Sequence, residues 1–158
     1  MQAIQPFLWF NDNAEEAARF YVSVFPNARI GTILRAPEGG PTPAGSVLTI
    51  TFFIDNQQFV ALNGGPHAKF TDALSLVAPC DSQAEIDAVW EKLTAGGGEE
   101  VACGWLRDKF GVSWQVVPAN IGELIQGKTP EGGKRAMQAL MGMKKLNVEA
   151  LRRAGGLA

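Results

Sequence analysis

The strongest constraint on the fold is an internal repeat. A shift of about 69 residues aligns two amphipathic helices, each preceded by polar cap residues. The matching pairs are Asp12 and Asp81, Asn13 and Ser82, Glu16 and Glu85, Phe20 and Val89, Tyr21 and Trp90, and Val24 and Leu93. Because cap and core positions coincide, we interpret the chain as a duplicated module.

Apolar and β-branched runs surround both helices in the same order. In the first half we predict strands over residues 4–10, 28–35, 47–54 and 59–63, with a turn at 55–57 and a mobile Pro/Gly-rich loop over 36–45. In the second half the predicted strands cover residues 73–78, 100–103, 105–106 and 113–117. Each half therefore reads βαβββ.

The helix ends carry their own signals. Asn11, Asp12 and Asn13 supply N-cap chemistry for the first helix, which ends before Pro26. Residues 79–82 are expected to cap the second helix, and Gly96–Gly98 to end it.

The stretch from Trp105 to Pro118 predicts a late strand entered through a tight turn. Asp108 and Gly111 make the turn, and an aromatic and β-branched run follows. Gln115 is the polar exception in this run, so it either faces solvent or looks into a cavity.

After Pro118 the pattern becomes helical. Residues 121–125 lead to a break at Gly127, and Thr129 and Pro130 predict the N-cap and first residue of a helix that runs to about Lys145. The expected apolar edge of this helix consists of Met137, Leu140, Met141 and Lys144. Asn147 is expected to cap a last short helix. We expect a brace packed on the sheet or on a partner subunit, rather than a peptide-binding or membrane helix.

Composition limits the class of protein. With 158 residues, 46% hydrophobic, the chain can bury a real core, and we expect one compact domain with modules at 1–65 and 66–120 and a helical extension at 121–158. A net charge of -2 gives no basic field for nucleic acid. Without an apolar run of membrane-spanning length or a signal-peptide pattern, we expect a cytoplasmic protein with no membrane partner. Cys80 and Cys103 are expected to be reduced thiols, with a disulfide bond between them as the alternative, and Cys103 is expected to be an inert buried thiol.

The chain resembles the vicinal oxygen chelate superfamily, which includes glyoxalase I and the bleomycin-resistance proteins. It looks most like the PhnB-like branch, whose members are often labelled 3-demethylubiquinone-9 3-methyltransferase. The segments that carry the resemblance are Pro6–Phe10, Asn63–His67, Trp90–Leu93, Cys103–Leu106, Trp114–Gln115 and, more weakly, Met143–Leu146.

The resemblance implies an α+β fold in which the two βαβββ modules form a concave, mostly antiparallel eight-stranded sheet, often completed by a homodimer, with a ligand pocket inside. In metal-dependent members, the first and fourth strands of each module supply four ligands. Here the corresponding places fall on Gln115, on Ala61, near Gln5 or Pro6, and near Leu74 or Ser75. None is His, Asp or Glu, so we expect no metal site and no cofactor, with a divalent ion as the less favoured alternative.

Six residues are candidates for function. Phe7, Trp9, Ser75, Trp105 and Gln115 are predicted to line a ligand pocket, although strand aromatics are also common core residues. His67, the only histidine, is a candidate acid/base group or lone metal ligand, against a plain role in a linker.

Three functions follow as hypotheses. The first is a metal-free homodimer that binds a small, partly aromatic or polar molecule. The second is a metal-dependent lyase or isomerase that uses His67 or Gln115. The third is a methyltransferase, as the branch's label suggests, but the glycine clusters do not form a strand-to-helix nucleotide loop.

Overall fold

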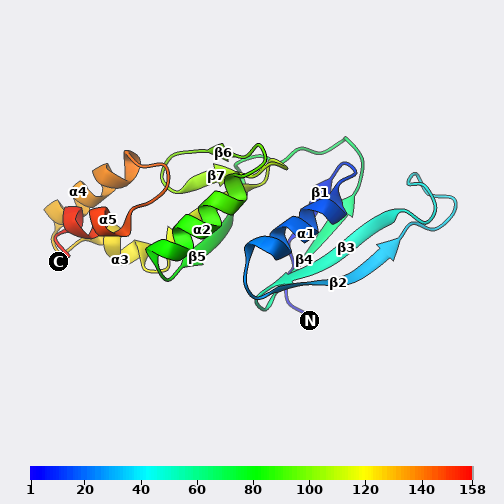
Figure 1. The fold of residues 1–158 in the computed structure, drawn as a ribbon, viewed down its shortest axis with the longest axis horizontal. Coiled ribbons are helices and arrows are strands. Elements are labelled where there is room, and N and C mark those ends of the chain that lie inside the picture. Colours follow the sequence, from blue (N-terminus) through cyan, green and yellow to red (C-terminus); the bar gives the residue numbers. More distant parts are fainter. Residues whose placement is uncertain (158) are drawn as a thin grey trace. The chain divides into compact units, whose positions relative to one another are not determined.

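A computed structural model describes residues 1–157, and its chain divides into two compact units, Met1–Lys69 and the residues from Phe70 onward (Figure 1). The first unit contains β1 (Phe7–Phe10), α1 (Ala14–Val24), β2 (Ala28–Arg35), β3 (Val47–Ile54) and β4 (Gln57–Asn63). The second contains β5 (Leu76–Cys80), α2 (Gln83–Thr94), β6 (Glu99–Glu100), β7 (Trp105–Arg107) and β8 (Ser113–Pro118), followed by α3 (Ile121–Gln126), α4 (Pro130–Met141) and α5 (Val148–Gly155).

Each unit holds one four-stranded sheet of the same topology. The strand orders are β1-β4-β3-β2 and β5-β8-β7-β6. In both sheets the first and last strands of the module pair in parallel, and the other pairs are antiparallel. The predicted α+β fold, with two βαβββ modules and C-terminal helices, is confirmed.

One helix packs on one face of each sheet. Tyr21 and Val24 of α1, which the repeat aligns with Trp90 and Leu93 of α2, are buried. The Tyr21 ring stacks on Phe52 at 5.7 Å between centroids. In α2 the matching residues Trp90 and Leu93 are buried in the same way. Because side chains alternate along a strand, the residues between the buried ones point to the opposite face. In the described part of each unit, no helix of that unit's own module packs on that face.

Several of the predicted element boundaries are corrected. The strand predicted at 59–63 starts at Gln57, so the predicted turn covers only residues 55–56. The first strand starts at Phe7 rather than at residue 4, and the strand predicted at 100–103 is the short β6. The strand predicted at 73–78 is β5, which starts at Leu76 because a turn precedes it. In this turn Thr71 Oγ1 accepts a hydrogen bond from the Ala73 amide. The fourth helix ends at Met141, where Gly142 caps it, and not near Lys145.

The cap of α1 is also corrected. Asn13 occupies the N-cap position but its side chain makes no capping hydrogen bond. Instead, Asn63 at the end of β4 accepts a hydrogen bond from the Ala14 amide through Oδ1, at 2.8 Å, and its Nδ2 donates to the Val47 carbonyl. The free amides of a helix start can be satisfied by any nearby acceptor, so a distant strand residue replaces the local cap. In α2 the predicted cap is confirmed, since Ser82 Oγ accepts from the Glu85 amide.

The three C-terminal helices pack around the end of β8. Their core consists of Val117, Leu124, Leu146 and Leu151. The predicted caps are confirmed: Thr129 accepts from the Gly132 amide and Asn147 from the Ala150 amide.

The start of α4 meets the end of α5 backbone to backbone. A Cβ on Gly132 would lie only 2.5 Å from the Gly155 carbonyl oxygen, so this contact requires glycine. The apolar edge predicted for α4 is wrong at three of its four positions, since Lys144 is exposed and lies beyond the end of the helix. Met137 and Met141 are 41% and 67% exposed, and Ala136 is buried in their place. Over residues 1–157, no helix has both the length and the apolar character that crossing a membrane requires.

Candidate functional site

Gln115 lies in a cross-strand row on the face of the second sheet opposite α2. The sheet register places Val77 of β5 on one side of Gln115 and Trp105 of β7 on the other. We call these three residues the Gln115 row. Val77 is 54% exposed, whereas the strand neighbours Trp114 and Val116 are buried on the α2 face. The row therefore places one amide between two apolar side chains.

The amide of Gln115 is oriented by a second polar side chain. Its Nε2 donates to Ser75 Oγ at 2.9 Å, and Ser75 stands two residues before Val77. The structure thus brings together three of the predicted pocket residues, Ser75, Trp105 and Gln115. Within residues 1–157, no hydrogen bond to Gln115 Oε1 is seen, so this oxygen can accept one from a bound molecule.

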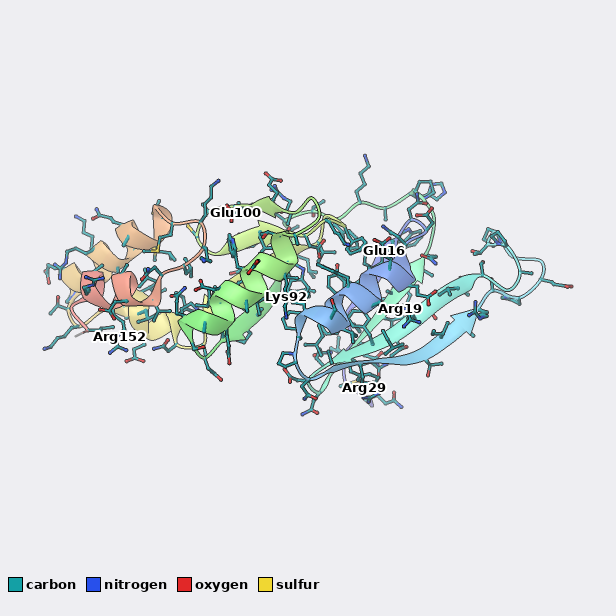
Figure 2. All side chains as sticks on the ribbon, viewed as in Figure 1. Glu16, Arg19, Arg29, Lys92, Glu100 and Arg152 are labelled. Carbon is teal, nitrogen blue, oxygen red and sulfur yellow. The ribbon has the colours of Figure 1, made fainter. Side chains whose placement is uncertain are left out.

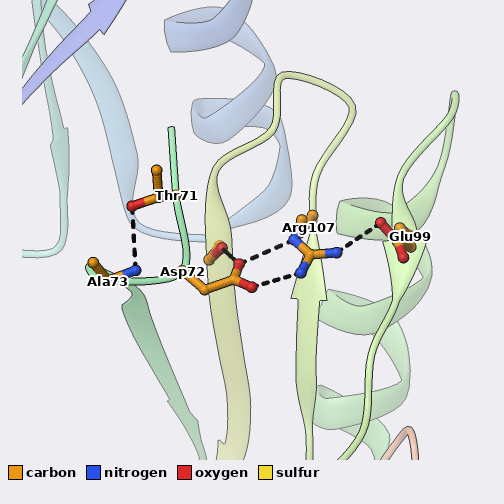
Figure 3. A network of polar contacts seen from close by, with 6 residues as sticks. Thr71, Asp72, Ala73, Glu99 and Arg107 are labelled. Carbon is orange, nitrogen blue, oxygen red and sulfur yellow. Dashed lines mark hydrogen bonds and ion pairs between the residues drawn. The ribbon is translucent and has the colours of Figure 1, made fainter. Parts of the chain in front are cut away.

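A charged network borders the Gln115 row. Arg107 lies two residues after Trp105 on β7, so both side chains are on the same face of the sheet. Arg107 donates to both carboxylate oxygens of Asp72, and its other terminal nitrogen donates to Glu99 at 2.8 Å (Figure 3). Ser113 Oγ donates to the same Asp72 carboxylate at 2.6 Å. Asp72 precedes β5, so these contacts hold the segment that leads into the strand against β7 and β8.

The network compensates the charge of Arg107. Hydrogen bonds from Arg107 and then from Ser113 lower the pKa of Asp72 to about 2, and the carboxylates of Asp72 and Glu99 raise the pKa of Arg107. Because its pKa is lowered, Asp72 stays ionised even where an ordinary carboxyl group would be protonated. The network is therefore complete at neutral and mildly acidic pH and is lost only as the pH falls toward 2. A cation held by two carboxylates is a poor site for an anionic ligand, so this face favours neutral polar groups.

The matching face of the first sheet is aromatic. Phe7, Val60 and Thr51 form the row that corresponds to the Gln115 row. Trp9 lies two residues along β1 and is 38% exposed; its Nε1 donates to the Gly65 carbonyl at 2.9 Å. A Cβ on Gly64 would lie 2.3 Å from the indole ring, so glycine allows the ring to lie against the backbone. Trp9 is therefore a fixed, partly exposed aromatic surface.

The register corrects the positions expected for metal ligands. Ala61 is fully buried on the α1 face, and the residue equivalent to Gln115 is Val60. On the first strands the residues paired with Val60 and Gln115 are Phe7 and Val77. Among these four positions only Gln115 carries a ligand atom, and in residues 1–157 no group of three His, Cys, Asp or Glu side chains could hold an ion. The side chains present do not fit the superfamily's metal quartet.

The remaining candidates are His67 and the two cysteines. His67 is exposed in the segment between β4 and β5. Cys80 and Cys103 are free thiols, and burial, with the charges of Glu85 and Asp81, raises the pKa of Cys80 to about 11. The Cys80 thiol therefore stays protonated at neutral pH and is a weak nucleophile.

Sequence reasoning assigned Asp108 to the β7–β8 turn but missed the contacts of its carboxylate. Asp108 is 3% exposed; its Oδ1 accepts from the amides of Phe110 and Val112, and its Oδ2 accepts from Trp114 Nε1 at 2.9 Å. In the sequence, Asp108 stands four residues before Val112 and six before Trp114. This spacing was the available signal for the contacts. Asp108 fixes the strand that carries Gln115.

The chain matches a known family over most of its length. Residues 2–117 match the 3-demethylubiquinone-9 3-methyltransferase family. Among solved structures, a PhnB protein from Bacillus cereus, described as a 3-demethylubiquinone-9 3-methyltransferase, is 37% identical, with a TM-score of 0.66 over 73% of this chain and 99% of its own. The comparison with curated proteins gives no match.

More distant structures share the fold. A protein from Pseudomonas aeruginosa is 22% identical, with a TM-score of 0.61 over 75% of this chain and 98% of its own. The fosfomycin resistance protein FosX from Mesorhizobium loti is 16% identical, with a TM-score of 0.52 over 73% of this chain and 89% of its own. These matches, with the family match and the twice-repeated βαβββ topology, place the chain: it belongs to the 3-demethylubiquinone-9 3-methyltransferase family, the PhnB-like branch of the vicinal oxygen chelate fold.

Proposed function

We propose that the chain is a cytoplasmic, homodimeric binding protein for a small planar molecule that is partly aromatic and carries neutral polar groups, and that it works without the superfamily's metal quartet. The observation that carries this proposal is the Gln115 row, in which an oriented amide lies between Val77 and Trp105 on the sheet face opposite α2. Ligand sites commonly place a few polar groups among apolar walls in this way.

The first unit supports the aromatic part of the proposal. Trp9 has its only donor satisfied by Gly65, so its exposed ring needs no further polar partner. An aromatic ring held in this way can stack on a planar ligand with little loss of side-chain entropy. Phe7, 59% exposed, adds apolar area beside it.

We expect Gln115→Ala to weaken binding about tenfold, because the variant loses one hydrogen bond to the ligand, worth about 1 to 1.5 kcal/mol. Ligand-detected NMR with a library of heteroaromatic amides identifies binders, and a titration of each binder with both proteins gives the affinities. Gln126→Ala, which removes an exposed amide from α3, is the matched control and should bind as the unaltered chain does. Binders whose affinity is the same for Gln115→Ala would contradict the proposed site.

Methyl transfer is the second candidate, and the family's own description favours it. The described glycine pairs give it no structural basis: Gly64 and Gly65 follow β4 without a helix after them, and Gly96–Gly98 follow α2. A dinucleotide or nucleotide loop needs glycines between a strand and a helix N-terminus. Binding of S-adenosylmethionine, measured by calorimetry, would move methyl transfer ahead of the binding-protein proposal.

A further inference from the structure

The face of the first sheet opposite α1 carries a cation. The sheet register places Arg29 of β2 beside Phe53 of β3, and Phe53 beside Gln58 of β4. We call these three residues the Arg29 row. Phe52, the strand neighbour of Phe53, is buried on the α1 side, so the row lies on the other face. Gln58 Nε2 donates to Gln5 Oε1 at 2.7 Å, so neutral amides stand beyond the ring of Phe53.

The guanidinium of Arg29 is held on the ring of Phe53. Its central carbon lies 3.8 Å from the ring centroid, which is a cation–π contact. Gly31 stands two residues after Arg29, and a Cβ there would lie 2.9 Å from Cε2 of Phe53. Glycine therefore lets the ring lie close to the β2 backbone, where the guanidinium stacks on it. Within residues 1–157, no hydrogen bond or ion pair of this guanidinium is seen, so its N–H donors are available to a ligand.

In the described part of the first unit, no acid pairs with Arg29. The strands of this sheet carry one other charged residue, Arg35, which donates to the Gly45 carbonyl at 3.1 Å. Asp55, in the turn between β3 and β4, accepts a hydrogen bond from Asn27 Nδ2 at 3.1 Å. Figure 2 shows Arg29 on the sheet and Glu16 on α1. The other acids of the unit also lie at α1 or in the 36–45 loop: Asp12, Glu15 and Glu38.

The second sheet carries the opposite charge at the matching position. In the repeat, Phe53 of β3 and Arg107 of β7 occupy equivalent positions in the register. The outer strand places Arg29 beside Phe53 in the first sheet and Glu99 beside Arg107 in the second. The carboxylate of Glu99 compensates an arginine, whereas the ring of Phe53 holds an arginine without removing its charge. The Arg29 row therefore suits an anionic ligand, whereas the Gln115 row suits a neutral one.

We propose that the Arg29 row is a binding site for a small aromatic carboxylate, separate from the neutral ligand of the Gln115 row. The guanidinium donates two parallel hydrogen bonds to the carboxylate, a geometry that arginine favours. The aromatic ring of the ligand packs on Thr51 and Val60, which are partly exposed and lie next to the Arg29 row on the same face. All of these residues belong to the first unit, so the site stands or fails independently of Gln115.

NMR titrations of the full chain with benzoate and with benzamide test the site. The unaltered chain should bind benzoate about tenfold or more tightly than benzamide, because only the anion accepts charge-assisted hydrogen bonds from arginine. Arg29→Gln should weaken benzoate binding by about the same factor and abolish the preference. Arg29→Lys should give an intermediate loss, because an ammonium keeps the charge but not the planar fork.

Arg19→Gln is the matched control for Arg29→Gln. Arg19 is an exposed arginine of the same unit, but it lies on α1, where it pairs with Glu15 (Figure 2). The variant should bind benzoate as the unaltered chain does. Gln115→Ala should also leave benzoate binding unchanged, which separates this site from the ligand site of the proposed function.

Three results would overturn the proposal. The first is an unaltered chain that binds benzoate no more tightly than benzamide, or not at all. The second is equal benzoate binding by the unaltered chain and Arg29→Gln, or a loss that appears with Gln115→Ala instead. The third is acetate that competes as strongly as benzoate, which would show an adventitious ion only. Arg29 is exposed, so circular dichroism should show unchanged folding; if Arg29→Gln does unfold, Arg29→Lys and the acetate competition decide the outcome.

Discussion

Asp108→Ala is expected to destabilise the fold by about 3 to 5 kcal/mol. The variant removes the carboxylate that accepts hydrogen bonds from the part-buried Phe110 amide, the buried Val112 amide and the Trp114 indole N–H. Each unsatisfied buried donor costs about 1 to 3 kcal/mol, and relaxation recovers part of the sum. Urea unfolding followed by fluorescence measures the change in free energy.

Two variants separate the contributions within this network. Asp108→Asn keeps one acceptor oxygen for the amides but presents an NH₂ group to Trp114, so an intermediate loss is expected. Asp12→Ala removes an exposed carboxylate and should change the stability by less than about 0.5 kcal/mol. A loss of less than 1 kcal/mol for Asp108→Ala would show that the turn does not depend on this carboxylate.

Leu146→Ala is expected to cost about 2 to 5 kcal/mol. Leu146 is fully buried with Val117, Leu124 and Leu151, and its backbone carbonyl accepts a hydrogen bond from Gln83. Truncation leaves a cavity where the extension joins the second module, and a cavity adds to the lost transfer free energy. The same urea titration measures the loss, and amide hydrogen exchange should show it first in α4 and α5.

The matched control is Leu74→Ala. Leu74 is in the same unit and 65% exposed, so the same truncation should cost less than about 0.5 kcal/mol. Equal losses for the two variants would mean that the C-terminal cluster adds no specific stability to the unit.

The fold could be predicted from the sequence because local and long-range signals agree. The repeat places Tyr21 on Trp90 and Val24 on Leu93, and all four side chains are buried against their own sheets. Caps made by a neighbouring residue, as at Ser82 and Thr129, were also predictable. The cap that Asn63 provides was not, because its acceptor comes from 49 residues away in the chain.

The candidate site was predictable in composition but not in register. The sequence indicates that Gln115 is the odd polar residue of its strand, and the structure pairs it with Ser75 as a neighbour on the same face. A one-residue error in register moves a side chain to the other face of a sheet, which is why Ala61 was expected where Val60 lies. The Asp72–Arg107 contact was missed because it joins residues 35 positions apart that share no local motif.

Native mass spectrometry of the purified protein, compared with its denatured mass, tests the central claim most directly. A small-molecule-binding protein that lacks the metal quartet should appear as a dimer without a stoichiometric divalent ion. Addition of an aromatic amide found by NMR should then give a mass increase that Gln115→Ala reduces. One divalent ion per chain, lost in the Gln115→Ala variant, would contradict the account and make metal-dependent catalysis the leading function.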